Sequence, residues 1–278
     1  MDLIVACTAK PCDGLLYYSY EYASHLGVKL VIIPHYKFTV KDYIDSITKK
    51  YIHCKNVEFE YFAEPDDVVL IMGRSCMTLP WKDLHRYNHE SQFSLRDLFG
   101  GKVIPVYSEN HPKEYYEALE FWNPTAVVDL CDTEVYPNGY GHHFEKRVNF
   151  SIYKDPVPDV QFEHLLLGTN KQYYQAAELY CPSLKSYSII TYNEPFVNPF
   201  LKNIFAPVDN LLGLFETYVY TKQTFDPAPR LIQECKYYGK DMIYKRPFDI
   251  QDGGKIYWSR PVIDIDVEPI LKAVKELS

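Results

Sequence analysis

The residues best suited to chemistry lie in one segment, 218–244. An apolar, β-branched run ends at Tyr220, a turn with two prolines follows, and the next helical pattern carries Arg230 and Glu234. A helix that begins behind a parallel strand presents unpaired N–H groups and a positive dipole end, and both features bind phosphate. Arg230 adds a bidentate donor at that end, while Glu234, one turn further on, can accept hydrogen bonds from two ribose hydroxyls. The segment therefore predicts a clamp for a nucleotide diphosphate.

The same pair of residues also fits a purely structural role. Arg and Glu at positions i and i+4 of a helix commonly form a surface ion pair, which contributes only ~0.2–0.5 kcal/mol. The residue types alone leave both interpretations open.

Other nucleotide and hydrolase motifs are missing from the sequence. No strand is followed by G-x-G-x-x-G and no P-loop pattern occurs, so dinucleotide oxidoreductases and P-loop enzymes lose their main support. The G-x-S-x-G elbow of α/β-hydrolases and the H-E-x-x-H pair of zinc proteases are also missing.

Two patterns resemble metal sites but have simpler explanations. Asp264 and Asp266 form an Asp-x-Asp pattern, yet they directly precede an amphipathic helix, so we interpret Asp266 as its N-cap. His85 and His89 are spaced for one helical face, but no third ligand accompanies them, and a solvated helix face explains them better. We therefore expect no metal site and no metal cofactor.

The elements that must position these residues alternate along the first half of the chain. Short apolar runs, typical of buried strands, are followed by segments of helical period. One of these helices, 40–50, ends in two lysines that suit its C-terminal dipole. Such alternation predicts an α/β fold with a parallel sheet covered on both faces. The predicted strands are 3–7, 28–34, 67–72, 102–107 and 126–130, and the predicted helices are 13–26, 40–50 and 112–121.

Turn-forming residues and prolines concentrate at 136–143 and 154–159, which indicates a domain boundary. The alternation then restarts. We therefore predict two Rossmann-like domains, 1–150 and 151–278. The predicted strands of the second domain are 165–167, 186–191, 217–220 and 241–244, and its predicted helices are 172–180, 230–238 and 268–277.

The segment 218–244, the two-domain layout and the turn at 166–170 together resemble nucleotide-sugar-dependent glycosyltransferases of the GT-B fold, of viral or bacterial type. The resemblance implies two Rossmann-like parallel-sheet domains facing across a cleft, with the acceptor side in the first and the nucleotide-sugar donor in the second. It implies an enzyme that transfers a hexosyl or pentosyl group from a donor such as a UDP-sugar to a hydroxyl acceptor. The nucleotide-diphosphate sugar is then a co-substrate, and no cofactor is implied.

The resemblance also assigns roles to individual residues. Glu234 corresponds to the ribose ligand and Arg230 to the diphosphate contact. The remaining donor-binding candidates are the pyrophosphate loop Gly168, Thr169 and Asn170, and two residues lining the donor side, Thr221 and Asp226. Common retaining members carry paired glutamates, whereas here Asp226 stands eight residues before Glu234, so retention or inversion stays open.

An inverting transfer needs a base that takes the proton of the acceptor hydroxyl. In a parallel sheet, such groups belong to loops at the carboxyl ends of the strands. Asp13, His35 and Glu109 are the candidates for this catalytic role. Each of them would equally serve as a hydrogen-bonded loop residue.

Net charge bears on the acceptor. The formal charge of −8 opposes a polyanion, and the N-terminal half has no basic run longer than Lys49-Lys50, so a glycan acceptor is favoured over DNA. A phage-type glycosyltransferase acting on 5-hydroxymethylcytosine in DNA is the alternative acceptor class. A UDP-sugar epimerase and a non-catalytic nucleotide-sugar binding module are further alternatives, because fold does not fix function.

Composition indicates the compartment. The seven cysteines occur singly, which is neither a disulfide framework nor a zinc pattern and fits a reducing environment. The longest apolar runs are too short to span a bilayer, and the N-terminus lacks the bases of a signal peptide. We expect a cytoplasmic protein, in the host cytoplasm if the protein is viral.

Overall fold

The computed structural model describes residues 2–35, 37–59, 64–72, 102–107, 124, 126–129, 131–135, 142–144, 147–191, 198–221, 230–245 and 263–277. Contacts divide the chain into two compact units. The first comprises Met1–Ile47, His53–Ile152 and Asp264–Ser278, and the second comprises Thr48–Ile52 and Tyr153–Ile263.

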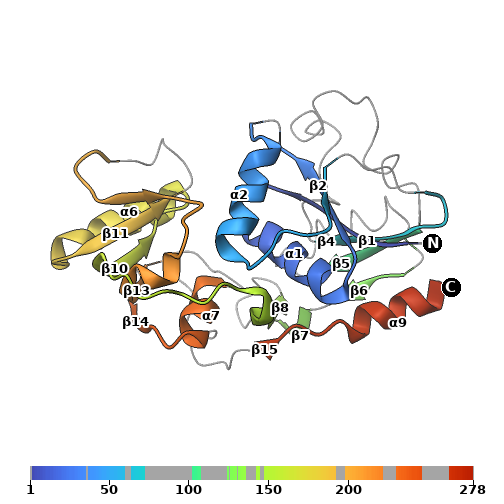
Figure 1. The fold of residues 1–278 in the computed structure, drawn as a ribbon. Coiled ribbons are helices and arrows are strands. Elements are labelled where there is room, and N and C mark those ends of the chain that lie inside the picture. The colour runs from blue at the N-terminus through green and yellow to red at the C-terminus, as the bar shows by residue number, and fades with distance from the viewer. Residues whose placement is uncertain are drawn as a thin grey trace. The chain divides into compact units, whose positions relative to one another are not determined.

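The first unit contains a six-stranded sheet with strand order β3-β2-β1-β4-β5-β6 (Figure 1). All of its pairings are parallel. The chain begins at the centre of the sheet and winds outward first to one edge and then to the other, as in doubly wound nucleotide-binding sheets. The strands are β1 (Leu3–Ala9), β2 (Lys29–Pro34), β3 (Val57–Glu58), β4 (Val68–Met72), β5 (Lys102–Tyr107) and β6 (Val128–Asp129).

Helix α1 (Gly14–Leu26) packs on β1 and β2 and has well-defined ends. Asp13 is its N-cap and accepts from the Leu15 amide at 3.0 Å. Gly27 ends the helix in the left-handed conformation at φ 70°, which glycine adopts without steric cost. Three tyrosines of this helix, Tyr18, Tyr20 and Tyr22, are buried, so some of the 26 tyrosines of the chain fill the core.

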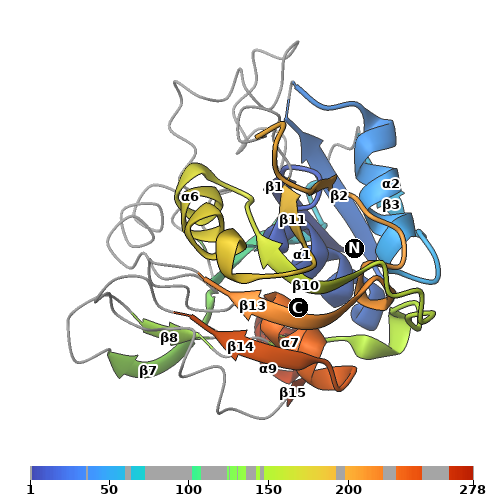
Figure 2. The ribbon, with the colours of Figure 1, turned by 90° about the vertical axis from the view of Figure 1, so that its left-hand side faces the viewer.

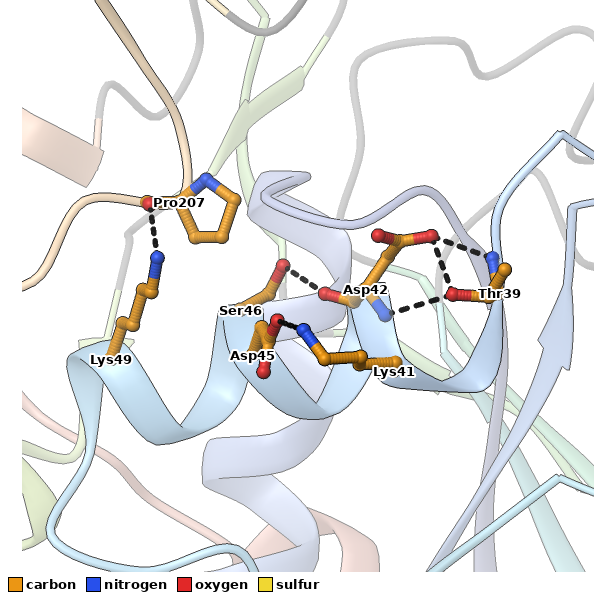
Figure 3. A network of polar contacts seen from close by, with 7 residues as sticks. All are labelled: Thr39, Lys41, Asp42, Asp45, Ser46, Lys49 and Pro207. Atoms are coloured by element: carbon orange, nitrogen blue, oxygen red, sulfur yellow. Dashed lines mark hydrogen bonds and ion pairs between the residues drawn. The ribbon is translucent and has the colours of Figure 1, made fainter.

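Helix α2 (Val40–Lys50) begins with a reciprocal cap, drawn in Figure 3. The amide and hydroxyl of Thr39 donate to Asp42 Oδ2 at 2.6 and 2.8 Å. Lys41 and Asp45 pair one turn apart along the exposed side. The last residues of α2 belong to the second unit, where Lys49 Nζ donates to the Pro207 carbonyl at 3.0 Å (Figure 3).

The C-terminal helix α9 (Glu268–Leu277) packs on β5 and β6 of the first unit. Ile270 and Ala273 are its buried residues, and Lys102 Nζ of β5 donates to the Leu277 carbonyl at 2.8 Å. This placement differs from the predicted division, which put residues 264–278 in the second domain. Helical periodicity shows that α9 has an apolar side but not which sheet covers it.

Short elements lie around the region predicted as the boundary. They are the antiparallel pair β7 (Cys131–Val135) and β8 (His142–Phe144), the strand β9 (Arg147–Val148) and the 3-10 turn η2 (Phe150–Ile152), and β9 forms a two-stranded sheet with β15 (Ile263–Asp264) from near the C-terminal helix. Their brevity explains why apolar patterning did not predict them. The change of unit falls between Ile152 and Tyr153.

The second unit contains a five-stranded parallel sheet, in the order β12-β11-β10-β13-β14. The order repeats the outward winding of the first sheet. Its elements are β10 (Phe162–Leu167), α6 (Lys171–Tyr180), η3 (Cys181–Ser183), β11 (Tyr187–Thr191), β12 (Asn203–Phe205), η5 (Leu211–Gly213), β13 (Phe215–Tyr220), α7 (Arg230–Tyr237) and β14 (Asp241–Tyr244).

Helices α6 and α7 cover opposite faces of this sheet (Figure 2). Leu165 packs in the core cluster that contains Ile232 of α7, whereas its neighbour Leu166 packs in the cluster that contains Ala177 of α6. Consecutive strand residues point to opposite faces, so a continuous apolar run is what a doubly covered strand requires.

The chain that enters the second unit is fixed along its surface. The Val157 amide donates to Asn210 Oδ1 at 2.8 Å, and Asn210 Nδ2 donates back to the Val157 carbonyl at 2.7 Å. The amides of Asp159 and Gln161 donate to the carbonyls of Gly213 and Leu214 at 2.9 Å. Residues 153–161 are therefore part of the second unit rather than a free connector.

The prediction of an α/β chain with two parallel sheets is confirmed. The strands at 102–107 and 241–244 and the helices at 40–50 and 268–277 have the predicted bounds. The predicted helix 112–121 lies outside the described residues. Strands β3 and β12 were not predicted, because each has too few residues to show a pattern.

The close approach at Gly213 gives a stability prediction. A Cβ added there would overlap the Val157 carbonyl and the side chain of Asn210, so Gly213→Ala should lower the free energy of unfolding by about 1–3 kcal/mol. Gly14 starts α1 with open space around it, and Gly14→Ala should change that energy by less than about 0.5 kcal/mol or raise it. Urea denaturation followed by circular dichroism measures both variants, and equal midpoints would contradict the packing described.

Candidate functional site

The carboxyl edge of the second sheet gathers most of the predicted donor residues. Strands β10 and β13 are parallel neighbours, and from them the chain winds outward in opposite directions. In open α/β sheets this switch point is where ligands bind, outside the carboxyl ends of the strands. The turn Gly168–Asn170 follows β10, and Thr221 follows β13. The strand order thus brings two segments that are distant in sequence to one edge.

The turn after β10 is tightly built. Gly168 donates its amide to the Ile190 carbonyl at 2.7 Å, and a Cβ on Gly168 would come within 2.5 Å of Ile189 Cγ2. Asn170 caps α6, with Oδ1 accepting from the Tyr173 amide at 3.0 Å. Thr169 between them is half-buried. Glycine is required here by close packing, and the side chain of Asn170 is occupied by the helix start.

On the neighbouring strand, Thr221 is buried at the end of β13. Asp226 lies outside the described residues. Arg230 is the first residue of α7, as predicted, and so lies at the positive end of the helix dipole.

The most developed polar cluster of the second unit surrounds Glu234. Its Oε1 lies 2.5 Å from Lys50 Nζ, 3.1 Å from the donating Tyr153 hydroxyl and 4.0 Å from Arg230 Nη1. Arg230 Nη1 also donates to Tyr153 Oη at 2.8 Å. The side chain of Glu234 is 3% exposed, that of Arg230 9% and that of Lys50 19%. Arg230 and Glu234 therefore belong to a buried polar network and do not form the surface ion pair that was the alternative interpretation.

Aromatic contacts complete this cluster. Lys50 Nζ lies 5.3 Å from the centre of the Tyr153 ring, within cation–π range. The rings of Tyr51 and Tyr153 meet edge to face at 5.0 Å, and the two residues form an isolated β-bridge. The Lys154 amide donates to the Lys50 carbonyl at 3.1 Å. These contacts bind the segments 48–52 and 153–154 to each other beside α7.

Sequence reasoning identified Arg230 and Glu234 but missed Lys50 and Tyr153. The Lys49-Lys50 pair was explained by the dipole of the helix that it ends, and Tyr153 directly precedes the turn-rich stretch 154–159, which was interpreted as part of the domain boundary. No motif signals either residue, because their partners are distant in sequence and only the fold brings them together.

The contacts of the Glu234 carboxylate with Lys50, Arg230 and Tyr153 engage the same oxygen, Oε1. Two cations and a hydroxyl donor surround that one oxygen, which compensates for the water lost on burial. The arrangement holds the Glu234 carboxylate in place through one of its two oxygens.

The predicted catalytic candidates belong to the first unit. Asp13 is exposed at the start of α1, where its Oδ1 serves as the N-cap acceptor. His35 is buried after β2. The Lys37 amide donates to its Nδ1 at 3.2 Å, so the neutral ring carries its proton on Nε2. Glu109 lies outside the described residues.

His35 is fixed further by the Tyr43 hydroxyl. The His35 amide donates to Tyr43 Oη at 2.8 Å, and that hydroxyl donates to the Ala9 carbonyl at 2.8 Å. The ends of β1 and β2 are joined in this way. His35 thus has a clear structural role, and its catalytic assignment stays a prediction.

The buried thiols are poorly suited to nucleophilic chemistry. Burial raises the pKa of Cys181 to about 11 and that of Cys235 well above its usual range. Both are therefore protonated at neutral pH, and the thiolate is the nucleophile.

The described residues contain no group of three or more His, Cys, Asp or Glu side chains placed to hold a metal ion. Asp266 Oδ1 accepts from the Glu268 amide at 3.0 Å, so Asp266 contacts the start of α9 but lies one residue before the predicted N-cap position, which Val267 occupies. In the same ranges, none of the helices has the length and apolar character that a membrane crossing requires.

No protein-family model and no curated protein matches this sequence.

The hydroxyl of Tyr153 connects Arg230 with Glu234, and its removal gives a second stability prediction. Tyr153→Phe should lower the free energy of unfolding by about 1–3 kcal/mol, because a buried donor and a buried acceptor each lose a partner. Tyr237→Phe, at a half-exposed position of the same helix, should change it by less than about 0.5 kcal/mol. Chemical denaturation compares the two variants. Similar values for both would show that the network contributes little.

Proposed function

We propose that the protein is a glycosyltransferase, which moves a sugar from a nucleotide-diphosphate donor, a UDP-sugar, to a hydroxyl of a glycan. The observation that carries the proposal is the placement of Arg230 at the first position of α7, the helix that follows strand β13 at the switch point of the second sheet. Phosphate groups bind at helix starts in this position, and an arginine there matches them in charge and geometry.

The chemistry of a sugar transfer explains why such a site is needed. Displacement at the anomeric carbon releases a nucleoside diphosphate, so negative charge develops on the leaving group. Arg230 and the first amides of α7 would stabilise this charge in the transition state. Glu234, fixed through Oε1 by Lys50 and Tyr153, would accept from the ribose through Oε2. Gly168, Thr169 and Asn170 would lie along the pyrophosphate.

The acceptor base would come from the first unit, in the GT-B arrangement that places the two sheets on either side of the substrates. Of the two described candidates, Asp13 fits this role better. It is exposed after β1, and its hydrogen bond from the Leu15 amide engages Oδ1. The Nδ1 lone pair of His35, which would take the proton, already accepts from the Lys37 amide, so this histidine would first have to give up that hydrogen bond.

Ligand binding tests the donor site directly. In a thermal-shift screen, UDP and UDP-sugars at 100 times their dissociation constant should stabilise the protein by about 2.7 kcal/mol. Arg230→Lys keeps the charge but loses the planar fork, and it should weaken UDP binding about tenfold in calorimetry. Lys185→Gln, at an exposed position of the same unit, should bind as the unmodified protein does. A protein that binds no nucleotide would overturn the proposal.

Product analysis tests the reaction. With radiolabelled UDP-glucose and other UDP-sugars, label should appear in an oligosaccharide panel. Label only in hydroxymethylcytosine DNA would identify the DNA-modifying alternative, and conversion of the donor without an acceptor would identify an epimerase. Donor binding with neither transfer nor hydrolysis would indicate a non-catalytic module.

Metal dependence gives a further prediction. Since Arg230 and a helix start supply the positive charge for the diphosphate, transfer should persist at an unchanged rate in EDTA. Complete loss of transfer in EDTA with rescue by Mn²⁺ would contradict this and would return attention to Asp264 and Asp266. A parallel reaction with added Mg²⁺ and Mn²⁺ serves as the control.

A further inference from the structure

Gln233 is a buried residue that neither the sequence patterns nor the proposed site explains. It lies in α7 between Arg230 and Glu234 and is 2% exposed. Its amide oxygen, Oε1, is buried and has no hydrogen-bond partner in the described part of the chain. Buried polar atoms are nearly always hydrogen-bonded in native proteins, so this oxygen calls for a donor.

The position of Gln233 on the helix shows which side it faces. Ile232 and Cys235 of α7 pack into the core of the second sheet, together with Leu231 and Tyr238. At helical spacing, Gln233 lies on the opposite side, away from the sheet. Gln233 is therefore not part of the apolar packing between α7 and its sheet.

Gln233 and Glu234 follow Arg230 by three and four residues, so both flank Arg230 on this outer side of the helix. Gln233 presents its amide oxygen Oε1, which has no hydrogen-bond partner in the described part of the chain, and Glu234 presents a carboxylate that Lys50 and Tyr153 hold through its Oε1. Two adjacent acceptors beside a cation at a helix start match a ligand that carries two neighbouring hydroxyl groups next to a phosphate. The 2′,3′-diol of a ribonucleotide has this chemistry.

We propose that Gln233 Oε1 accepts a hydrogen bond from a ribose hydroxyl of the bound nucleotide and, with Glu234, selects ribonucleotides over deoxyribonucleotides. This inference rests on the proposed function, which supplies the nucleotide. It adds a residue and a specificity to that site. A site built to bond a hydroxyl discriminates against an analogue without it, because the protein acceptor is then left unsatisfied.

The proposal predicts opposite effects on the free and the bound protein. Gln233→Leu removes an unsatisfied buried acceptor, so the free protein should melt at the same temperature or higher. The same change should weaken UDP binding about fivefold to tenfold, the loss of roughly one hydrogen bond to a neutral group. If Gln233 served only in packing, its replacement would not weaken UDP binding while the melting temperature of the free protein stayed the same or rose.

The experiment combines two proteins with three ligands. Calorimetry measures the binding of UDP, 2′-deoxy-UDP and 3′-deoxy-UDP to the unmodified protein and to Gln233→Leu. The unmodified protein should prefer UDP over at least one deoxy analogue by about fivefold or more, and Gln233→Leu should lose that preference. Gln175→Leu, at an exposed position of α6, is the matched control and should keep it.

Each result is decisive. Equal UDP affinity of the unmodified protein and Gln233→Leu overturns the assignment, and an internal water then satisfies Oε1. Equal affinity of the unmodified protein for UDP and for both deoxy analogues overturns the assignment too. This comparison uses the unmodified protein alone, so it does not depend on whether a variant folds. If the unmodified protein binds no nucleotide at all, the proposed function itself fails, and this result is distinct from both of the others.

Discussion

A carboxylate stays ionised inside a protein only where cations and hydrogen-bond donors replace the water that it loses. In the second unit this requirement centres on Glu234. Lys50, Tyr153 and Arg230 converge on one of its oxygens, and they come from three separate segments of the chain. Burial of this one charge therefore organises the start of the unit, the short segment 48–52 and the helix that carries the candidate diphosphate contact.

The same cluster relates stability to the proposed chemistry. Arg230 is held by Tyr153, so its guanidinium is already ordered before any ligand arrives. A preordered cation loses less conformational entropy on binding, and it needs less reorganisation when charge develops on a leaving group. The network would thus serve two purposes. It compensates for the burial of the Glu234 carboxylate, and it orients the Arg230 guanidinium at the N-terminal end of α7.

The sequence carried enough information for the alternating fold and for one half of the cluster. Continuous apolar runs such as 68–72 identify doubly covered strands, and the spacing of Arg230 and Glu234 identifies a polar side of α7. The sheet that covers α9 could not be predicted, because amphipathicity gives a helix an apolar side but no partner. Lys50 could not be connected with Glu234 for a similar reason, since charge patterning reports local pairs and this pair is created by tertiary structure. Gln233 gave no signal at all, because an amide side chain in a helix is ordinary until its burial is known.

The way the chain passes between the two units bears on the order of events during synthesis. It changes unit after residues 47, 52, 152 and 263, and α9 packs on β5 and β6 of the first unit. On the ribosome, the first sheet is therefore translated long before the helix that covers part of it. Domains usually fold as they emerge, N-terminal first. Here the first unit is complete only once residues 264–277 have been made, because α9 covers part of its β5–β6 region.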